Sequence, residues 1–259
     1  MDNKKDLAEY FQVSVRLVEH LDYLLWEFTE LGGMSHLIAR LLQGADIAPD
    51  SRVLDLGCGK GAVGLSLLAS LPGSIGHVTG VDAYAPFVRE AQRAAQKRGL
   101  AGQCRFLQAD IREYPAQDPL FDCVLYVSVG NVLGDLTGTM AALRSHVRPG
   151  GYMVVDDGYL AGDAVDFPGY EDMAGREETL ARLTAHGDEL AGEVAIPAQA
   201  IAAQNKEYFS RITSRAQELA GRFPDLAHDI ENFVRKEQEE NTILERHVRC
   251  ATWLLRRAS

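Results

Sequence analysis

The sequence has few of the residues that build disulfide or metal sites. Its four cysteines are widely separated, and none forms a C-x-x-C pair or lies near a histidine at a metal-ligand spacing. The seven histidines show no paired spacing either. We therefore expect no metal site and no disulfide framework. The thiols expected to be reduced and mostly buried are Cys58, Cys104, Cys123 and Cys250.

Long apolar runs and positive charge are scarce as well. The first six residues lack the apolar core of a secretion signal, and no apolar run approaches the roughly 18 residues that a membrane span needs. We therefore expect a cytoplasmic protein with no membrane partner. Lysine and arginine number 26 against 37 acidic residues, for a net charge of -11. Such a balance repels a phosphate backbone, so nucleic acid is a disfavoured partner.

The two ends of the chain have helical periodicity. From residue 7 to about residue 43, apolar residues recur at steps of three and four, which predicts an amphipathic helix interrupted by Gly32 and Gly33. Further helices are predicted over residues 176–185, 198–220 and 226–247. A weak strand is predicted over residues 193–196 and a last strand over residues 248–255.

The middle of the chain alternates short apolar or β-branched runs with helical stretches, as in a parallel sheet with crossover helices. The predicted strands cover residues 52–56, 77–82, 104–108, 122–127 and 152–156, and five βα units are expected. The predicted helices between them cover residues 62–70, 86–98 and 136–146.

These patterns predict an α/β fold. It consists of a doubly wound, mostly parallel sheet of about seven strands, the last one antiparallel, with N-terminal helices and a C-terminal helical insertion that forms a lid. The predicted parts are an N-terminal helical lid over residues 1–48, a Rossmann-like core over residues 49–160, and the helical insertion with the final strands over residues 161–259.

The most informative segment is VLDLGCGKG, residues 53–61, an apolar strand that ends in Gly57, Gly59 and Gly61. Glycines allow a ligand to approach the backbone, and a helix start offers free N–H groups. A tight turn without a ligand is the alternative. The pattern Gly59-x-Gly61-x-x-Gly64 also matches the dinucleotide fingerprint, so the glycines alone do not identify the cofactor.

Acidic residues near predicted strand ends separate the two cofactors. Asp82 is placed to accept both hydroxyls of a ribose. Asp110 is placed to accept from an adenine amine, while the N–H of Ile111 donates to the ring. Each acid could instead cap a helix. Together with Asp55 inside the first strand and the early Gly57, they favour S-adenosylmethionine (SAM) over a nicotinamide cofactor.

In this order and spacing, VLDLGCGKG, GVD, QAD, FDCVLYVSVGN and RPGG resemble the class I SAM-dependent methyltransferases over about residues 51–157. The chain is similar to a bacterial subgroup of stand-alone small methyltransferases. The resemblance implies SAM as cofactor and S-adenosylhomocysteine as product. It also implies which residues hold the cofactor. The methionine end would lie on Asp55, Gly57, Cys58, Gly59 and Gly61, the ribose on Asp82 and Ala83, the adenine on Asp110 and Ile111, and the sulfonium above Ser128 and Val129.

The acceptor side is less clearly marked. After the fourth strand, VSVGN lacks the Asn-Pro-Pro-Tyr type of motif, which puts nucleobase nitrogen in doubt as an acceptor. Asp156 and Asp157 are candidates for a catalytic base, although acids at a strand end commonly cap or face solvent. The charged run over residues 235–240 predicts a solvated helix face. Candidate pocket residues, which could equally belong to the core, are Tyr10, Tyr23, Trp26, Asn131 and Tyr208.

We therefore expect a methyltransferase that acts on a small molecule by in-line displacement. One alternative is a nicotinamide-dependent oxidoreductase, although the sequence has no Tyr-x-x-x-Lys. Another is a non-catalytic SAM-binding protein whose lid binds a partner, and the lid could equally form a homodimer interface. A protein or nucleic-acid methyltransferase would be favoured if basic residues clustered at the cofactor mouth. The residues in question are Arg144, Arg148, Arg256 and Arg257.

Overall fold

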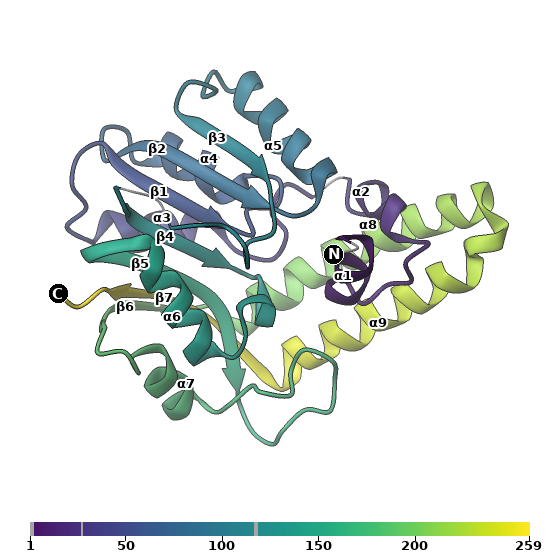
Figure 1. The fold of residues 1–259 in the computed structure, drawn as a ribbon. Coiled ribbons are helices and arrows are strands. Elements are labelled where there is room, and N and C mark those ends of the chain that lie inside the picture. Colours follow the sequence, from purple (N-terminus) through teal and green to yellow (C-terminus); the bar gives the residue numbers. More distant parts are fainter. Residues whose placement is uncertain (1–2, 27, 117–118) are drawn as a thin grey trace.

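A computed structural model describes residues 3–26, 28–116 and 119–259 of the chain (Figure 1). At its centre lies a seven-stranded sheet of order β3-β2-β1-β4-β5-β7-β6. The strands are β1 Ser51–Leu56, β2 Ile75–Asp82, β3 Cys104–Gln108, β4 Phe121–Val127, β5 Val147–Leu160, β6 Glu189–Ala195 and β7 Val248–Arg256. The first five strands pair in parallel, and β7 runs antiparallel between β5 and β6. The predicted sheet is confirmed, although β6 begins four residues before the predicted strand.

Helices cover both faces of the sheet. On one face lie α3 Ser35–Gln43, α4 Ala62–Ser70 and α5 Ala85–Lys97, and on the other lie α6 Leu136–His146 and α7 Arg176–Leu183. On the first face, side chains of α3 and α4 enclose one core with Val53 and Val154. On the second face, Met140 and Leu183 enclose another with Leu54 and Val155. The central strands β1, β4 and β5 are therefore buried on both faces, as parallel strands are.

The connection between β3 and β4 departs from the prediction. Among its described residues no helix forms, so the expected run of five βα units is wrong at this point. Pro115 lies in this connection, and proline disfavours helical backbone at the residue before it. The chain reaches β4 without a crossover helix in the described part.

The N-terminal prediction is also wrong in detail. Instead of one long helix, the segment forms α1 Asn3–Tyr10, a short 3-10 turn η1 Val18–His20, and α2 Leu21–Leu24. Gln12 follows α1 with φ +50°, a left-handed conformation that a right-handed helix cannot contain. The apolar residues still turn inward, but toward different partners. Leu21 packs near Tyr84 and Phe87 of the β2–α5 region, whereas Leu24 packs in a separate helical core.

That separate core belongs to a helical hairpin between β6 and β7. The hairpin consists of α8 Ala198–Arg222, the turn η3 Pro224–Leu226 and α9 Ala227–Arg246, and it extends away from the sheet (Figure 1). Leu24 and Phe28 pack against Ile212 and Phe233 of the hairpin. We call the hairpin with residues 3–26 and 28–33 the helical lobe. Its presence confirms the predicted C-terminal insertion.

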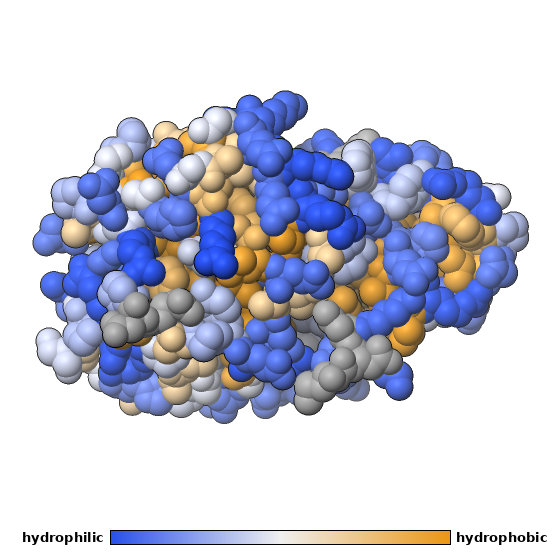
Figure 2. Space-filling view, turned by 45° about the horizontal axis from the view of Figure 1, so that its top comes forward, coloured by the Kyte–Doolittle hydropathy of each residue, from blue (hydrophilic) through white to orange (hydrophobic). Residues whose placement is uncertain are grey.

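The helical lobe meets the sheet along an apolar junction. Figure 2 shows hydrophobic side chains gathered near the middle of one face, between hydrophilic surfaces of the two parts. Within the described ranges, no helix combines the length and apolar character required to cross a membrane.

Gly32 joins the helical lobe to the end of β4. Its φ is +111°, and a Cβ there would lie 2.7 Å from the Ser128 Cβ. We expect Gly32→Ala to lower the free energy of unfolding by about 1–3 kcal/mol, because it adds both backbone strain and a steric clash. Urea denaturation measures the loss. Gly162→Ala is the control, since no atom lies within 4 Å of its added Cβ. Equal losses in the two variants would contradict this account.

Candidate active site

The glycine loop between β1 and α4 has the backbone shape of a ligand cradle. Gly57, Gly59 and Gly61 have φ values of +75°, +50° and +75°, a region that glycine adopts readily. A Cβ on Gly57 would lie 2.5 Å from Val129, and one on Gly61 would lie 2.8 Å from the Phe106 ring. The residue at the start of α4 is Gly61, which has no side chain to cap the helix, and in the first turn the backbone N–H of Gly64 bonds to the Asp55 carboxyl.

Asp82, at the end of β2, ties the loop to α5. Its Oδ2 accepts from Gly59 N at 2.8 Å, and its Oδ1 accepts from Tyr84 N at 2.8 Å. Burial raises the pKa of Asp82, while these two hydrogen bonds oppose the rise. A carboxylate has about four lone-pair sites, so acceptor capacity remains for ribose hydroxyls. Ala83 follows directly in the chain.

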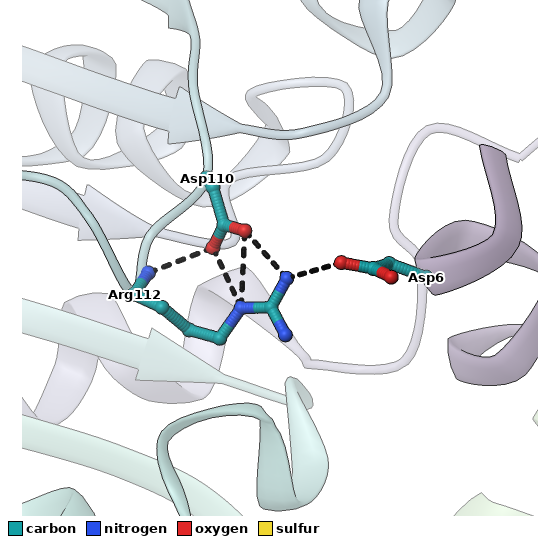
Figure 3. A network of polar contacts seen from close by, with 3 residues as sticks. All are labelled: Asp6, Asp110 and Arg112. Atoms are coloured by element: carbon teal, nitrogen blue, oxygen red, sulfur yellow. Dashed lines mark hydrogen bonds and ion pairs between the residues drawn. The ribbon is translucent and has the colours of Figure 1, made fainter. Parts of the chain in front are cut away.

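Asp110, after the end of β3, forms part of a network that the sequence did not predict. Arg112 Nε lies 3.0 Å from both carboxylate oxygens, and Arg112 Nη2 also reaches Asp6 Oδ2 of α1 at 2.7 Å (Figure 3). The guanidinium lowers the pKa of Asp110. The carboxylate expected to face adenine is thus held by Arg112 and linked to the N-terminal helix. The adjacent Ile111 is buried in the core beside the sheet.

Asp156 forms a closed set of hydrogen bonds below the end of β4. Its Oδ1 accepts from Ser128 Oγ at 2.9 Å, and its Oδ2 accepts from Thr252 Oγ1 at 2.5 Å. Ser128 itself has a left-handed φ of +54°. Since both oxygens are occupied and the residue is buried, Asp156 positions Ser128, and its candidacy as a catalytic base is not supported.

Asp55 is a buried carboxyl beside the cradle with one unpaired oxygen. It is only 2% exposed, and its Oδ2 has no hydrogen-bond partner in the described part of the protein. Burial, reinforced by the charge of Asp82 and opposed by a hydrogen bond from the Gly64 backbone, raises the pKa of Asp55 to about 7. Buried polar atoms are nearly always paired, so a lone acceptor at this place fits a ligand that brings a donor.

Cys58, on the same loop, is buried, and burial raises the pKa of its thiol well above the usual range. A thiol of this kind is unreactive, because the thiolate is the nucleophile.

Lys60 is a residue whose role the sequence did not reveal, because only its place in the glycine loop marked it. Its Nζ donates to Leu25 O at 2.6 Å and to Trp26 O at 3.3 Å, and forms an ion pair with Glu90 at 3.0 Å. The ammonium also lies 5.4 Å from the centre of the Phe87 ring. Lys60 is 4% exposed. It therefore fastens the N-terminal segment directly to the cofactor loop.

Tyr10, at the end of α1, is 44% exposed, and its ring packs edge-on against Phe11 with the ring centres 4.9 Å apart. Its place in an acceptor pocket stays a prediction. Asn131 Nδ2 donates to Gly169 O at 3.4 Å, which places Asn131 beside the loop after β5.

Three other predicted pocket residues are placed in the helical lobe instead. Tyr23 donates to Glu218 at 2.5 Å on the hairpin surface. Tyr208 donates to the backbone oxygen of Glu30 at 2.8 Å, within the lobe. Trp26 is 55% exposed. For Tyr23 and Tyr208 the helical periodicity reflects packing between the N-terminal segment and α8, while the backbone oxygen of Trp26 accepts from Lys60 of the cofactor loop. The pocket roles of these three residues stay predictions.

The charged run on α9 is not a uniformly solvated face, and that prediction is wrong. Tyr170, in the loop after β5, donates to Glu240 Oε1 at 3.0 Å. Burial and the neighbouring Glu240 raise the pKa of Glu237 to about 7. On β5, burial raises the pKa of Asp157 to about 6. Burial, and then the charges of Glu240 and Asp157, raise the pKa of the Tyr170 phenol.

The basic residues that would have favoured a macromolecular acceptor lie at the other end of the sheet. Arg144 pairs with Asp188, and Arg148 pairs with Asp122 at 2.6 Å. Arg256 faces Tyr152 near the start of β5, because β7 runs antiparallel to β5. Arg257 donates to a backbone oxygen at the same end. The side chains of Arg144, Arg148 and Arg257 are engaged, and all four arginines lie away from the cofactor loop.

The comparisons agree with this geometry. A family model described as a methyltransferase domain matches residues 47–243, more than half of the chain. The chain belongs to this methyltransferase family. The match confirms the predicted family and, with it, SAM as the cofactor that the family implies.

Two curated relatives share part of the chain. A demethylmenaquinone methyltransferase from Thermus thermophilus is 34% identical over 142 residues, which cover 49% of this chain and 62% of that protein. A sterol 24-C-methyltransferase from Gibberella zeae is 32% identical over 158 residues, which cover 58% of this chain and 41% of that protein. The chain thus spans less than two thirds of either relative.

Solved structures show the same fold over nearly the whole chain. A SAM-dependent methyltransferase from Geobacter sulfurreducens, in complex with S-adenosylhomocysteine, has a TM-score of 0.77 at 18% identity and covers 92% of this chain and 97% of its own. The [4+2]-cyclase SpnF has a TM-score of 0.73 at 16% identity, covering 99% and 96%. At these identities the likeness shows the fold alone.

Lys60 generates the first prediction from the site. We expect Lys60→Met to speed hydrogen exchange at residues 21–26, because leaving two carbonyls without a donor costs about 1–3 kcal/mol each. The strands of the sheet should exchange as before. Mass spectrometry of peptides from the exchanged protein measures both. Lys97→Met, on the exposed side of α5, is the matched control. Unchanged exchange at residues 21–26 would rule out the fastening role.

Glu237 generates a prediction about pH. An ordinary glutamate titrates near 4.5, whereas folded Glu237 keeps its proton to about pH 7. The unfolded chain therefore releases this proton first, and stability falls as pH rises from about 4.5 to about 7. Glu237→Gln removes the titration. We expect it to raise the melting temperature at pH 8 and to change it little at pH 4.5.

The control for this pH dependence is Glu231→Gln, because Glu231 lies exposed on the same helix. Its melting temperature should follow the wild type at both pH values. A gain in Glu237→Gln that is larger at pH 4.5 than at pH 8 would show that burial of the carboxylate is not the cause.

Proposed function

We propose that this chain is an enzyme that transfers the methyl group of SAM to a small-molecule acceptor. The observation that carries the proposal is the pair of bonds from Asp82 to the loop and to α5, beside three loop glycines with positive φ whose missing Cβ atoms let neighbouring side chains pack closely against the loop. Membership of the methyltransferase family supports it. The proposed cytoplasmic location is consistent with the acidic composition.

The residues present fit SAM. The glycine loop and the unpaired Oδ2 of Asp55 would hold the methionine end, and Asp82 with Ala83 would hold the ribose. Ser128 and Val129 would lie below the sulfonium, where Val129 packs against Gly57. Asp110 and Ile111 would hold the adenine, with Asp110 sharing its oxygens between the ring and Arg112. When bound, SAM supplies a methyl group on a positively charged sulfur that needs no acid to leave.

The chain's own contribution is then positioning and exclusion of water. Lys60 holds the N-terminal segment over the loop by donating to a backbone oxygen of that segment. Gly32 lets the segment pack closely against Ser128. Tyr10, which is 44% exposed on that segment, is our candidate for a wall of the acceptor pocket. The small-molecule class of the acceptor is supported by the engaged arginines at the far end of the sheet. The two curated relatives are named for small-molecule acceptors, a quinone precursor and a sterol.

Isothermal titration with S-adenosylhomocysteine and with NAD tests the proposal. We expect S-adenosylhomocysteine to bind and NAD not to bind. Asp82→Ala should weaken binding at least about tenfold, which corresponds to about 1.4 kcal/mol. Asp46→Ala should bind as the wild type does, because this exposed acid precedes β1 and lies at the opposite end of that strand from the loop. Binding of NAD alone would replace the proposal with an oxidoreductase. Tight binding without transfer to any acceptor would favour a non-catalytic SAM-binding protein.

A further inference from the structure

Arg112 folds back on Asp110 just after the end of β3. Its backbone N–H donates to Asp110 Oδ1 at 2.9 Å, its Nε donates to both carboxylate oxygens at 3.0 Å, and its Nη2 donates to Oδ2 at 2.5 Å. Ile111 between the two is buried in the core, and Glu113 N donates to Asp110 O at 3.2 Å. The backbone here forms an anchored turn, and the Asp110 carboxylate is held in one orientation.

The held carboxylate can still accept from a ligand. Three N–H groups of Arg112 bind it, whereas a carboxylate has about four lone-pair sites. The Asp110 side chain is 28% exposed, so a ligand can reach it. Ala109 N donates to Asp82 O at 3.0 Å, which places Asp110 at the same edge of the sheet as the proposed ribose acid.

The same guanidinium also binds α1. Arg112 Nη2 donates to Asp6 Oδ2 at 2.7 Å, from the nitrogen that also binds Asp110 (Figure 3). Ala8 of the same helix is buried in one apolar cluster with Tyr84, which follows closely after the end of β2. The helix α1 therefore rests on the ends of both β2 and β3, where the proposed ribose and adenine positions lie.

Without Arg112, two like charges would face each other in this place. Oδ2 of Asp6 and Oδ2 of Asp110 bind one nitrogen, so the two carboxylates lie close enough to repel each other. Most exposed ion pairs contribute little, but a bidentate arginine in a network of several charges is the exception. Loss of Arg112 would free the Asp110 side chain and also weaken the docking of α1.

We propose that Arg112 is a positioning residue for the cofactor: it presents Asp110 to the adenine amine and, through Asp6, makes cofactor affinity depend on the docking of α1. The inference rests on the proposed function and adds Arg112 and Asp6 to its cofactor site. Holding Asp110 in one rotamer before binding removes the entropy cost of ordering it in the complex. Coupling between two sites is reciprocal, so the bound cofactor must stabilise the docked helix by the same factor.

Isothermal titration of the full chain with S-adenosylhomocysteine and with S-inosylhomocysteine tests the inference. The second compound carries an oxygen where adenine carries its amine, so it cannot donate to Asp110 from that position. We expect Arg112→Met to weaken binding of S-adenosylhomocysteine about tenfold and to change binding of S-inosylhomocysteine less than about twofold.

Asp6→Asn, a mild change on the surface of α1, tests the link to the helix. It should weaken binding of S-adenosylhomocysteine about threefold in the wild-type background and have no further effect in Arg112→Met, because Asp6 acts through Arg112. The control is Glu9→Gln, which changes an exposed acid on the same helix and should bind as the wild type does.

Hydrogen exchange at residues 3–10 is the reciprocal measurement. S-adenosylhomocysteine should slow exchange there in the wild type and in Glu9→Gln, but not in Arg112→Met. Three results would overturn the inference: an equal loss of affinity for both compounds in Arg112→Met, additive effects of the two substitutions, or equal slowing of exchange in Arg112→Met and the wild type.

The same titrations separate the two proposals. If the wild type binds S-adenosylhomocysteine and neither Asp6→Asn nor Arg112→Met changes its affinity, the positioning role fails and the methyltransferase proposal stands. If the wild type does not bind S-adenosylhomocysteine, the proposed function itself fails.

Discussion

Both carboxylate oxygens of Asp82 accept backbone N–H groups, one from the glycine loop and one from the start of α5. A glycine loop has many accessible conformations, and Asp82 selects one of them by fixing its middle residue. Because Asp82 ends β2, next to β1 in the sheet, the sheet itself sets the position of the loop. The α4 N-terminus, the Asp55 carboxyl and the cover formed by the N-terminal segment all take their places relative to this fixed loop.

The N-terminal segment covers the loop through contacts that do not resemble an ordinary helix interface. Lys60 holds it by backbone oxygens, Gly32 lets it approach Ser128, and Arg112 links α1 to Asp110. The segment also packs on the helical hairpin, so it couples the hairpin to the cofactor loop. Arg112 has a particular place in this arrangement. The carboxylate that the family resemblance assigns to adenine is the one that also holds α1, so the two contacts share one group.

One helix can have faces of different electrostatic character. On α9, Arg235 and Glu239 form an exposed ion pair at 2.7 Å, while Glu240 accepts from Tyr170 of the loop after β5. Exposed pairs of this kind contribute little to stability. Burial raises the pKa values of Glu237 and Glu240, so their carboxylates are a cost to the folded state at high pH.

The sequence alone determined the sheet, the glycine loop and the acids at the strand ends. These features are set by residues that are neighbours in the chain, because an apolar run forms a strand and the residues just after it form the turn. Parallel strands then bring their carboxyl ends to one edge of the sheet. The family match extends that reading to SAM. What the tertiary structure decided was which partner each amphipathic segment found. Tyr23 and Tyr208 serve the helical lobe, Asp156 holds Ser128, and Glu237 turns inward although its neighbours are solvated. Periodicity identifies an apolar or polar face, but contacts between residues some two hundred positions apart determine what that face meets.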